Sequence, residues 1–199
     1  MSMILTLTRV SASDIARLTT PEAVNSFLAS VRPRRPELDA AREARIKALA
    51  AQGIQVPAPP APPEAFGFDT YASSEFFNGQ KMWHALHFLL TGHSDEGALP
   101  QGSLLVAGTP LPGDLGYGPA VAISAEETAA FSQYLDGLSC DEFLDRLDLE
   151  AMETNDIYPN IWDEERADLQ AEIGAYFDHL RSYCRQCADQ GLGMIRAIS

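Results

Sequence analysis

The sequence predicts an α+β fold: a small mixed sheet that includes strands from both ends of the chain and packs with several helices. Three stretches support this prediction. Residues 3–10 alternate in the manner of a strand, residues 81–92 are apolar at helical spacing, and residues 163–190 form a long amphipathic helix. With 199 residues, of which 46% are hydrophobic, a single domain spanning 1–199 is expected.

The N-terminal third begins with the strand and continues into helices. Thr20 and Pro21 are suited to the N-cap and first turn of a helix that runs to about residue 31. Residues 36–52 are rich in alanine and arginine and predict a further helix. Residues 56–63 read VPAPPAPP and predict an extended spacer. We interpret about 32–63 as an Arg/Pro-rich insertion in the single domain.

The central stretch, residues 81–92, reads KMWHALHFLLTG. We expect a helix that begins at Asn78, a favoured N-cap residue, and ends at Gly92. Its residues are apolar nearly all round, which predicts burial on more than one side. Residues 69–77 are expected to be an aromatic-rich loop leading into it.

Two histidines three residues apart, His84 and His87, share this helix and raise the question of a metal site. The pattern lacks the glutamate of the zinc-binding HExxH motif, and no third ligand is evident nearby. Structural histidines are therefore favoured over a polar binding pocket, and a metal is least favoured. We predict no metal and no cofactor. Lys81, at the helix start, is interpreted as an ordinary surface lysine rather than one held by a carboxylate or a ligand.

The C-terminal half carries clear helix-start signals. Ser124 with Glu127, and Ser139 with Glu142, each match the capping-box pattern. Residues 103–108 predict a short helix or a strand, residues 120–123 a strand, and residues 193–198 a last strand that we expect to pair with the first one. The loop 109–119 contains three glycines.

Cys184 and Cys187 form a CxxC pattern inside the long predicted helix. Redox CxxC motifs open a helix after a strand, so both are interpreted as reduced packing residues. The chain has three cysteines, which do not make a disulfide framework.

Several of these stretches resemble the YfbM-like family of bacterial proteins, a domain-of-unknown-function family. The resemblance rests on residues 81–92, on GYGPA at 116–120 followed by ISAEE at 123–127, on DIYP at 156–159 with Ile161-Trp162, and on the C-terminal helix and strand. It covers residues 1 to about 10 and about 69 to the end. It implies an α+β fold in a bacterial cytoplasmic protein, and it implies no activity.

The charge of the chain is strongly negative, at −14, with a pI near 4.5. Nucleic-acid binding depends on clustered lysine and arginine, so it is excluded as the expected function, whereas a basic protein partner is compatible. Residues 1–60 hold eight basic and five acidic side chains, and the remainder holds six and 23. No membrane span or signal peptide is expected, so we predict a cytoplasmic protein. The sequence leaves the oligomeric state open.

Two functions are considered from the sequence. The first is a binding or interaction module, including an inhibitor or immunity-type protein, because no catalytic motif is present. The alternative is a small-molecule enzyme or sensor, since a histidine in an aromatic cleft can carry out acid–base chemistry. Catalytic residues are not assigned. The candidate pocket residues are Lys81, Trp83, His84, His87, Tyr117, Tyr158 and Trp162.

Overall fold

The computed structural model describes residues 3–31, 36–52, 68 and 76–199. In chain order the elements are β1 (Leu5–Val10), α1 (Ala12–Ile15), α2 (Pro21–Val31), α3 (Pro36–Ala51), β2 (Phe76–Gln80), α4 (Trp83–Thr91), the 3₁₀ turn η2 (Gln101–Leu104), β3 (Thr109–Pro110), β4 (Val121–Ile123), α5 (Ala125–Asp136), α6 (Cys140–Leu144), α7 (Leu149–Thr154), α8 (Arg166–Asp189) and β5 (Gly193–Ile198).

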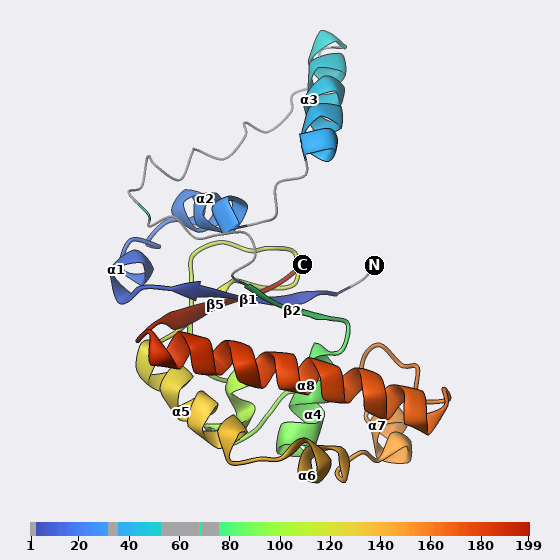
Figure 1. The fold of residues 1–199 in the computed structure, drawn as a ribbon. Helices are drawn as coiled ribbons and strands as arrows, with labels where there is room; N and C mark the ends of the chain where they lie inside the picture. Colours follow the sequence, from blue (N-terminus) through green and yellow to red (C-terminus); the bar gives the residue numbers. More distant parts are fainter. Residues whose placement is uncertain (1–2, 32–35, 53–67, 69–75) are drawn as a thin grey trace.

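One five-stranded sheet, in the order β2-β1-β5-β4-β3, lies at the centre of the fold. The predicted α+β class and the pairing of the first and last strands are both confirmed. The sheet was expected to be mixed, but every pair in the described part of the chain is antiparallel. Helix α8 returns to the end of the sheet from which α5 departs, so β5 runs back alongside β4 (Figure 1).

Helices cover both faces of the sheet, with α1 and α2 on one side and α4 to α8 on the other (Figure 1). Alternation along the strands sends neighbouring residues to opposite faces. Leu5 and Leu7 of β1 and Met194 of β5 belong to the larger core under α4 and α8. Val10 of β1 and Ile195 of β5 belong to the smaller core under α2.

Helix α4 is buried on all sides, as its composition predicts: Ala85, Leu86 and His87 have no exposed surface. Its predicted end is confirmed, because Gly92 has φ 77° and its N–H donates to the Phe88 carbonyl at 2.7 Å. Its predicted start at Asn78 is wrong. Asn78 lies in β2, and the N-cap residue is Met82.

Two strands are not predicted by the sequence: the two-residue β3 lies at the start of the expected loop 109–119, where it pairs with β4, and β2 lies where a loop and a helix start were expected. Residues 76–80 read FFNGQ, and an Asn-Gly pair usually marks a turn. The strand forms because β1 supplies antiparallel partners, with Leu7 opposite Phe77 and Thr8 opposite Phe76. Residues 76 and 77 of the predicted loop 69–77 belong to β2 instead, and 69–75 lies outside the described residues.

The remaining element predictions are largely confirmed. Both capping boxes form, at Ser124 and at Ser139. The stretch 103–108 overlaps η2, a 3₁₀ turn, and the long helix starts at Arg166 rather than residue 163. The helix predicted at 36–52 is α3. Residues 32–35 and 53–63 of the predicted insertion lie outside the described residues, so the insertion stays a prediction. No helix in the described part of the chain is long and apolar enough to cross a bilayer.

Candidate functional site

Four of the seven candidate pocket residues come from two segments that meet in space. Trp83 and His84 open α4, and Tyr158 and Trp162 lie in the connection between α7 and α8. The Trp83 ring stacks on the His84 ring, with centroids 4.9 Å apart and planes 16° from parallel. The Tyr158 ring lies 6.2 Å from Trp83. These contacts join residues 81–92 and 156–162, two of the stretches that carry the YfbM-like resemblance, into one cluster.

The hydrogen bonds of His84 tie these two segments to a third. Its Nδ1 accepts the backbone N–H of Tyr158 at 3.0 Å, and its Nε2 donates to the Ser94 carbonyl at 2.8 Å. A ring that accepts at one nitrogen and donates at the other is neutral. Burial also lowers the pKa of His84, although the Ser94 carbonyl and Asp95 oppose that shift. His84 is thus placed as a connector between loops.

The same cluster fixes the start of β1. The indole Nε1–H of Trp83 donates to the Met3 carbonyl at 3.3 Å, and the Met3 N–H donates to the Tyr158 hydroxyl at 3.2 Å. Trp162 donates its indole N–H to the Ile157 carbonyl at 2.7 Å. The polar atoms of these aromatics therefore serve main-chain groups of the fold.

His87 is fully buried in the core. Its Nε2 donates to the Glu96 carbonyl at 2.9 Å, and its Nδ1 has no hydrogen-bond partner among the described residues. The pKa of His87 is lowered to about 4, chiefly by burial, with a smaller contribution from Arg196 in the same direction and with the Glu96 carbonyl and Asp95 opposing it. His87 is therefore neutral near pH 7, with one ring nitrogen holding the loop after α4.

The other two candidates lie apart from this cluster. Lys81 is exposed between β2 and α4, and Tyr117 is 39% exposed in the loop between β3 and β4. Tyr117 makes no ring contact or side-chain hydrogen bond with the other six within the described ranges. The same ranges contain no group of three His, Cys, Asp or Glu side chains able to hold a metal ion. A ligand site at the seven residues stays a prediction.

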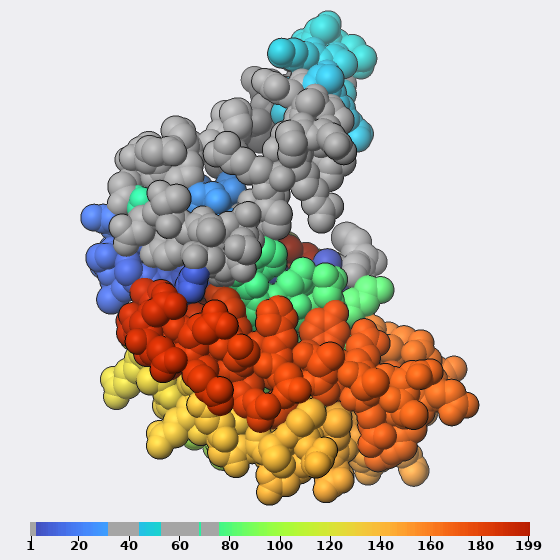
Figure 2. All heavy atoms as spheres, viewed as in Figure 1, coloured from blue at the N-terminus to red at the C-terminus, as the bar shows by residue number. Residues whose placement is uncertain are grey.

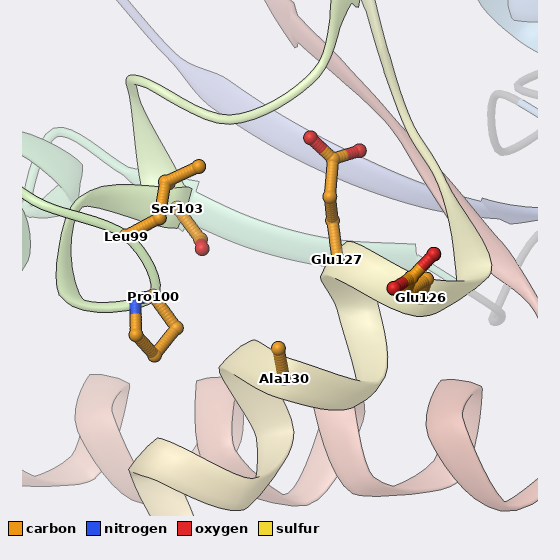
Figure 3. A pocket seen from close by; sticks show the side chains of 6 residues that line it. All are labelled: Leu99, Pro100, Ser103, Glu126, Glu127 and Ala130. Carbon is orange, nitrogen blue, oxygen red and sulfur yellow. The ribbon is translucent and has the colours of Figure 1, made fainter.

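A cavity of about 270 Å³ lies elsewhere, between η2 and the first turns of α5 (Figure 3). Its lining residues are Leu99, Pro100, Ser103, Glu126, Glu127 and Ala130. None of the seven candidates lines it. Ser103 is 2% exposed, and Figure 3 shows its hydroxyl pointing into the cavity. Sequence reasoning missed this site because the Glu126-Glu127 pair has the appearance of a solvated helix face.

The two glutamates of the cavity differ in their partners. Glu127 accepts the Gly108 N–H at 3.1 Å and the Ser124 N–H at 2.8 Å. Burial acts to raise the pKa of Glu127, but these hydrogen bonds outweigh burial, and the pKa is lowered. Glu126 is exposed at the cavity rim. Near pH 7 the cavity therefore has a fixed carboxylate that stays ionised.

Negative charge is concentrated in residues 141–172, which we call the acidic end. These residues form α6, α7 and the start of α8, the amber to orange atoms in the lower right of Figure 2. They carry twelve exposed carboxylates: Asp141, Glu142, Asp145, Asp148, Glu150, Glu153, Asp156, Asp163, Glu164, Glu165, Asp168 and Glu172.

The acidic end is neutralised from within only in small part, because two arginines stand among its twelve carboxylates. Both arginines donate to main-chain carbonyls: Arg146 to Leu89 at 3.2 Å and Arg166 to Leu147 at 2.8 Å. The ion pairs found among the described residues join Arg17 to Asp14, Arg181 to Asp178 and Arg185 to Asp136. None of them includes a carboxylate of the acidic end.

Comparison with known proteins places this arrangement in a family. The family model described as "Domain of unknown function (DUF1877)" matches residues 1–197. The chain belongs to this family. The solved structure of YfbM from Escherichia coli, described as a protein of unknown function, is similar over 100% of both chains, with a TM-score of 0.57 and 18% identity. That likeness shows a shared fold and confirms the YfbM-like resemblance. The comparison with curated proteins finds no match.

Proposed function

We propose that this protein is an interaction module that binds a basic protein partner through the acidic end, in the manner of an inhibitor or immunity-type protein that covers a basic surface. The observation that supports it is the set of twelve exposed carboxylates, none of which has an ion-pair partner within 4 Å in the described part of the chain. We also propose a bacterial cytoplasmic location, which rests on the family resemblance and the free cysteines.

The carboxylates of the acidic end destabilise the free protein and favour the binding of a basic partner. Like charges gathered at one end of a fold repel one another and lower its stability. A basic partner relieves this repulsion, and the field of the carboxylates accelerates its approach. The arginines of the acidic end point their donors at Leu89 and Leu147, so they leave the carboxylates available. Because the Debye length is about 8 Å at physiological salt, such binding weakens as salt is added.

The alternative function, a small-molecule enzyme or sensor at the His/Tyr/Trp cluster, has weaker support. Proton transfer by His84 would require breaking a hydrogen bond with either Tyr158 or Ser94. His87 is neutral and fully buried. Both histidines are thus in environments that suit structural roles better than acid–base chemistry.

The experiment is affinity capture from a bacterial lysate with tagged protein at about 50 mM and about 500 mM salt. A triple variant, Glu150→Gln with Glu153→Gln and Glu164→Gln, removes three charges of the acidic end. None of these three side chains caps a helix through a hydrogen bond. The matched control removes three exposed charges elsewhere: Glu22→Gln, Glu96→Gln and Asp189→Asn.

We expect a stoichiometric basic partner that is captured at low salt by the wild type and the control. The acidic-end variant is expected to lose it, and high salt to release it. If no partner is captured at either salt, or if the partner binds both variants equally, the proposal is wrong. Circular dichroism of both variants verifies that their folds are intact.

A further inference from the structure

We propose that His84 is a pH-sensitive latch: protonation of its ring releases the turn of residues 158–161 from helix α4. Two buried side chains anchor this turn at its ends, because Ile157 has no exposed surface and Trp162 is 5% exposed. Between them the chain lies at the surface, with Asn160 exposed. Opening is therefore confined to the short turn, and the anchors keep the rest of the fold in place.

The latch is the hydrogen bond that the His84 ring accepts. Its Nδ1 accepts the Tyr158 backbone N–H at 3.0 Å, and its Nε2 donates to the Ser94 carbonyl at 2.8 Å. A protonated imidazole carries an N–H on both nitrogens, so its Nδ1 no longer accepts. The two N–H groups then face and repel each other, whereas the bond to Ser94 is retained. A proton on His84 thus breaks the link to the turn and keeps the link to the loop after α4.

The backbone on both sides of Tyr158 is held in an uncommon conformation. Asp156 and Asn160 have φ of 50° and 64°, in the left-handed region, and the one other non-glycine residue with positive φ in the described ranges is Gln80. Asp and Asn tolerate this region better than most side chains, so the strain is modest. Such residues persist where surrounding contacts hold them, and they cluster at switch regions. Loss of the His84 contact removes one contact that holds this backbone.

The groups nearest to His84 decide its protonation. Burial lowers the pKa of His84 from the ordinary 6.5, and the Ser94 carbonyl and the Asp95 carboxylate oppose that shift. On the same helix, burial is the main cause that lowers the pKa of His87 to about 4, so this second histidine is neutral near pH 7. The closed latch is therefore complete above about pH 6.5 and is lost as the pH falls through the lowered pKa of His84.

The other segments that meet at His84 bring charge only at the surface. Lys81, just before α4, is exposed, and so are Asp156 and Asp163 in the connection between α7 and α8. No carboxylate of the described chain forms an ion pair with His84. Carboxylates with ordinary pKa values near 4 stay ionised while the histidine titrates. The opening is thus assigned to His84 and not to loss of the surrounding negative charge.

Opening of the latch acts on the acidic end, because the turn lies between Asp156 and Asp163. A looser turn lets these two carboxylates move relative to each other. A basic partner that contacts both then binds less tightly in acid. This consequence rests on the proposed function, whereas the latch is a property of the free protein and is tested without a partner.

The test is amide hydrogen exchange of the full chain, followed by NMR. The protection of the Tyr158 amide is its exchange rate relative to that of an unstructured chain at the same pH. We expect this protection to fall about threefold to tenfold between about pH 7 and about pH 5, which is the range for loss of one hydrogen bond. The ring nitrogens of His84, observed in the same samples, should titrate over the same pH range as this fall.

Three histidine variants separate the latch from a general loss of stability. His84→Asn keeps a side-chain oxygen that can accept the Tyr158 N–H and does not titrate, so the fall in protection should disappear. His93→Asn, the matched control, makes the same substitution at an exposed histidine of the neighbouring loop and should keep the fall. His87→Gln removes the other histidine of α4 and should keep it too.

The proposal is overturned if the Tyr158 protection in the wild type does not depend on pH, or if His84→Asn and His93→Asn show the same fall. It is also overturned if the fall disappears in His87→Gln, because exchange then follows unfolding of the whole domain. If circular dichroism shows that His84→Asn does not fold, the wild type decides: a titration of His84 outside the pH range of the fall contradicts the latch. The capture experiment can fail without changing any of these outcomes, so the two proposals are tested separately.

Discussion

We predict that the buried His87 of α4 makes the protein less stable as the pH falls. His87 has a pKa of about 4 in the folded protein and about 6.5 as an ordinary histidine. Because the folded pKa is depressed, the unfolded chain takes up the proton first as the pH falls. The stability is complete above about pH 6.5 and declines as the pH falls toward 4. The pKa of His84 is lowered too, so it adds in the same direction.

The loss of stability at low pH can be calculated from the difference between the folded and unfolded pKa of His87. Each unit of pKa difference corresponds to about 1.4 kcal/mol, so lowering the pH from about 6.5 to about 5 costs about 2 kcal/mol through His87 alone. Most carboxylates stay ionised over this window. Arg196, the cation near His87, also keeps its charge there.

The assay is urea unfolding at several pH values for the wild type and His87→Gln. Glutamine retains an N–H donor for the Glu96 carbonyl but does not titrate in this range. The variant should show a smaller loss of stability between about pH 6.5 and about pH 5, by about 2 kcal/mol. The exposed His179 supplies the control, and His179→Gln should keep the wild-type slope. If the stability of the wild type and that of His87→Gln fall equally between about pH 6.5 and about pH 5, His87 is not the source of the pH dependence.

Three further predictions concern stability and reactivity. Ser124→Ala removes the capping box of α5 and should lower the free energy of unfolding by about 1 kcal/mol, measured by urea denaturation. Tyr158→Phe removes the acceptor of the Met3 N–H and should cost about 1 kcal/mol in the same assay, while an unchanged stability would contradict the anchoring role of the cluster. Burial raises the pKa of the Cys184 and Cys187 thiols, the latter to about 11, so both should react with a thiol reagent far more slowly in the native protein than in urea. Fast native labelling at either cysteine would contradict this burial.

The parts of the fold that the sequence predicts are those encoded locally. Ser124 and Ser139 each lie three residues before a glutamate, and both capping boxes form as expected. The end of α4 depends on Gly92 alone, since glycine readily adopts the φ of 77° found there. The pairing of β1 with β5 was expected from two strand-like stretches at the ends of the chain.

The parts that the sequence does not predict depend on distant partners. Strand β2 contains a turn-like Asn-Gly pair, and its pairing with β1 overrides that local signal. The cavity joins Ser103 to Glu127, and the Gly108 N–H holds Glu127 across 19 residues of chain. No local pattern marks such a contact. The negative charge was visible in the sequence, but the inward-facing donors of Arg146 and Arg166 were not.

The acidic end is proposed to bind a basic protein. The most direct measurement is the Kd of the captured partner, determined by calorimetry for the wild type and for the two triple variants. Loss of three charges at Glu150, Glu153 and Glu164 should weaken binding by about tenfold or more, whereas the control at Glu22, Glu96 and Asp189 should change it by less than about threefold. Equal effects of the two triple variants would contradict the claim, because charge anywhere on the molecule would then serve as well as the acidic end.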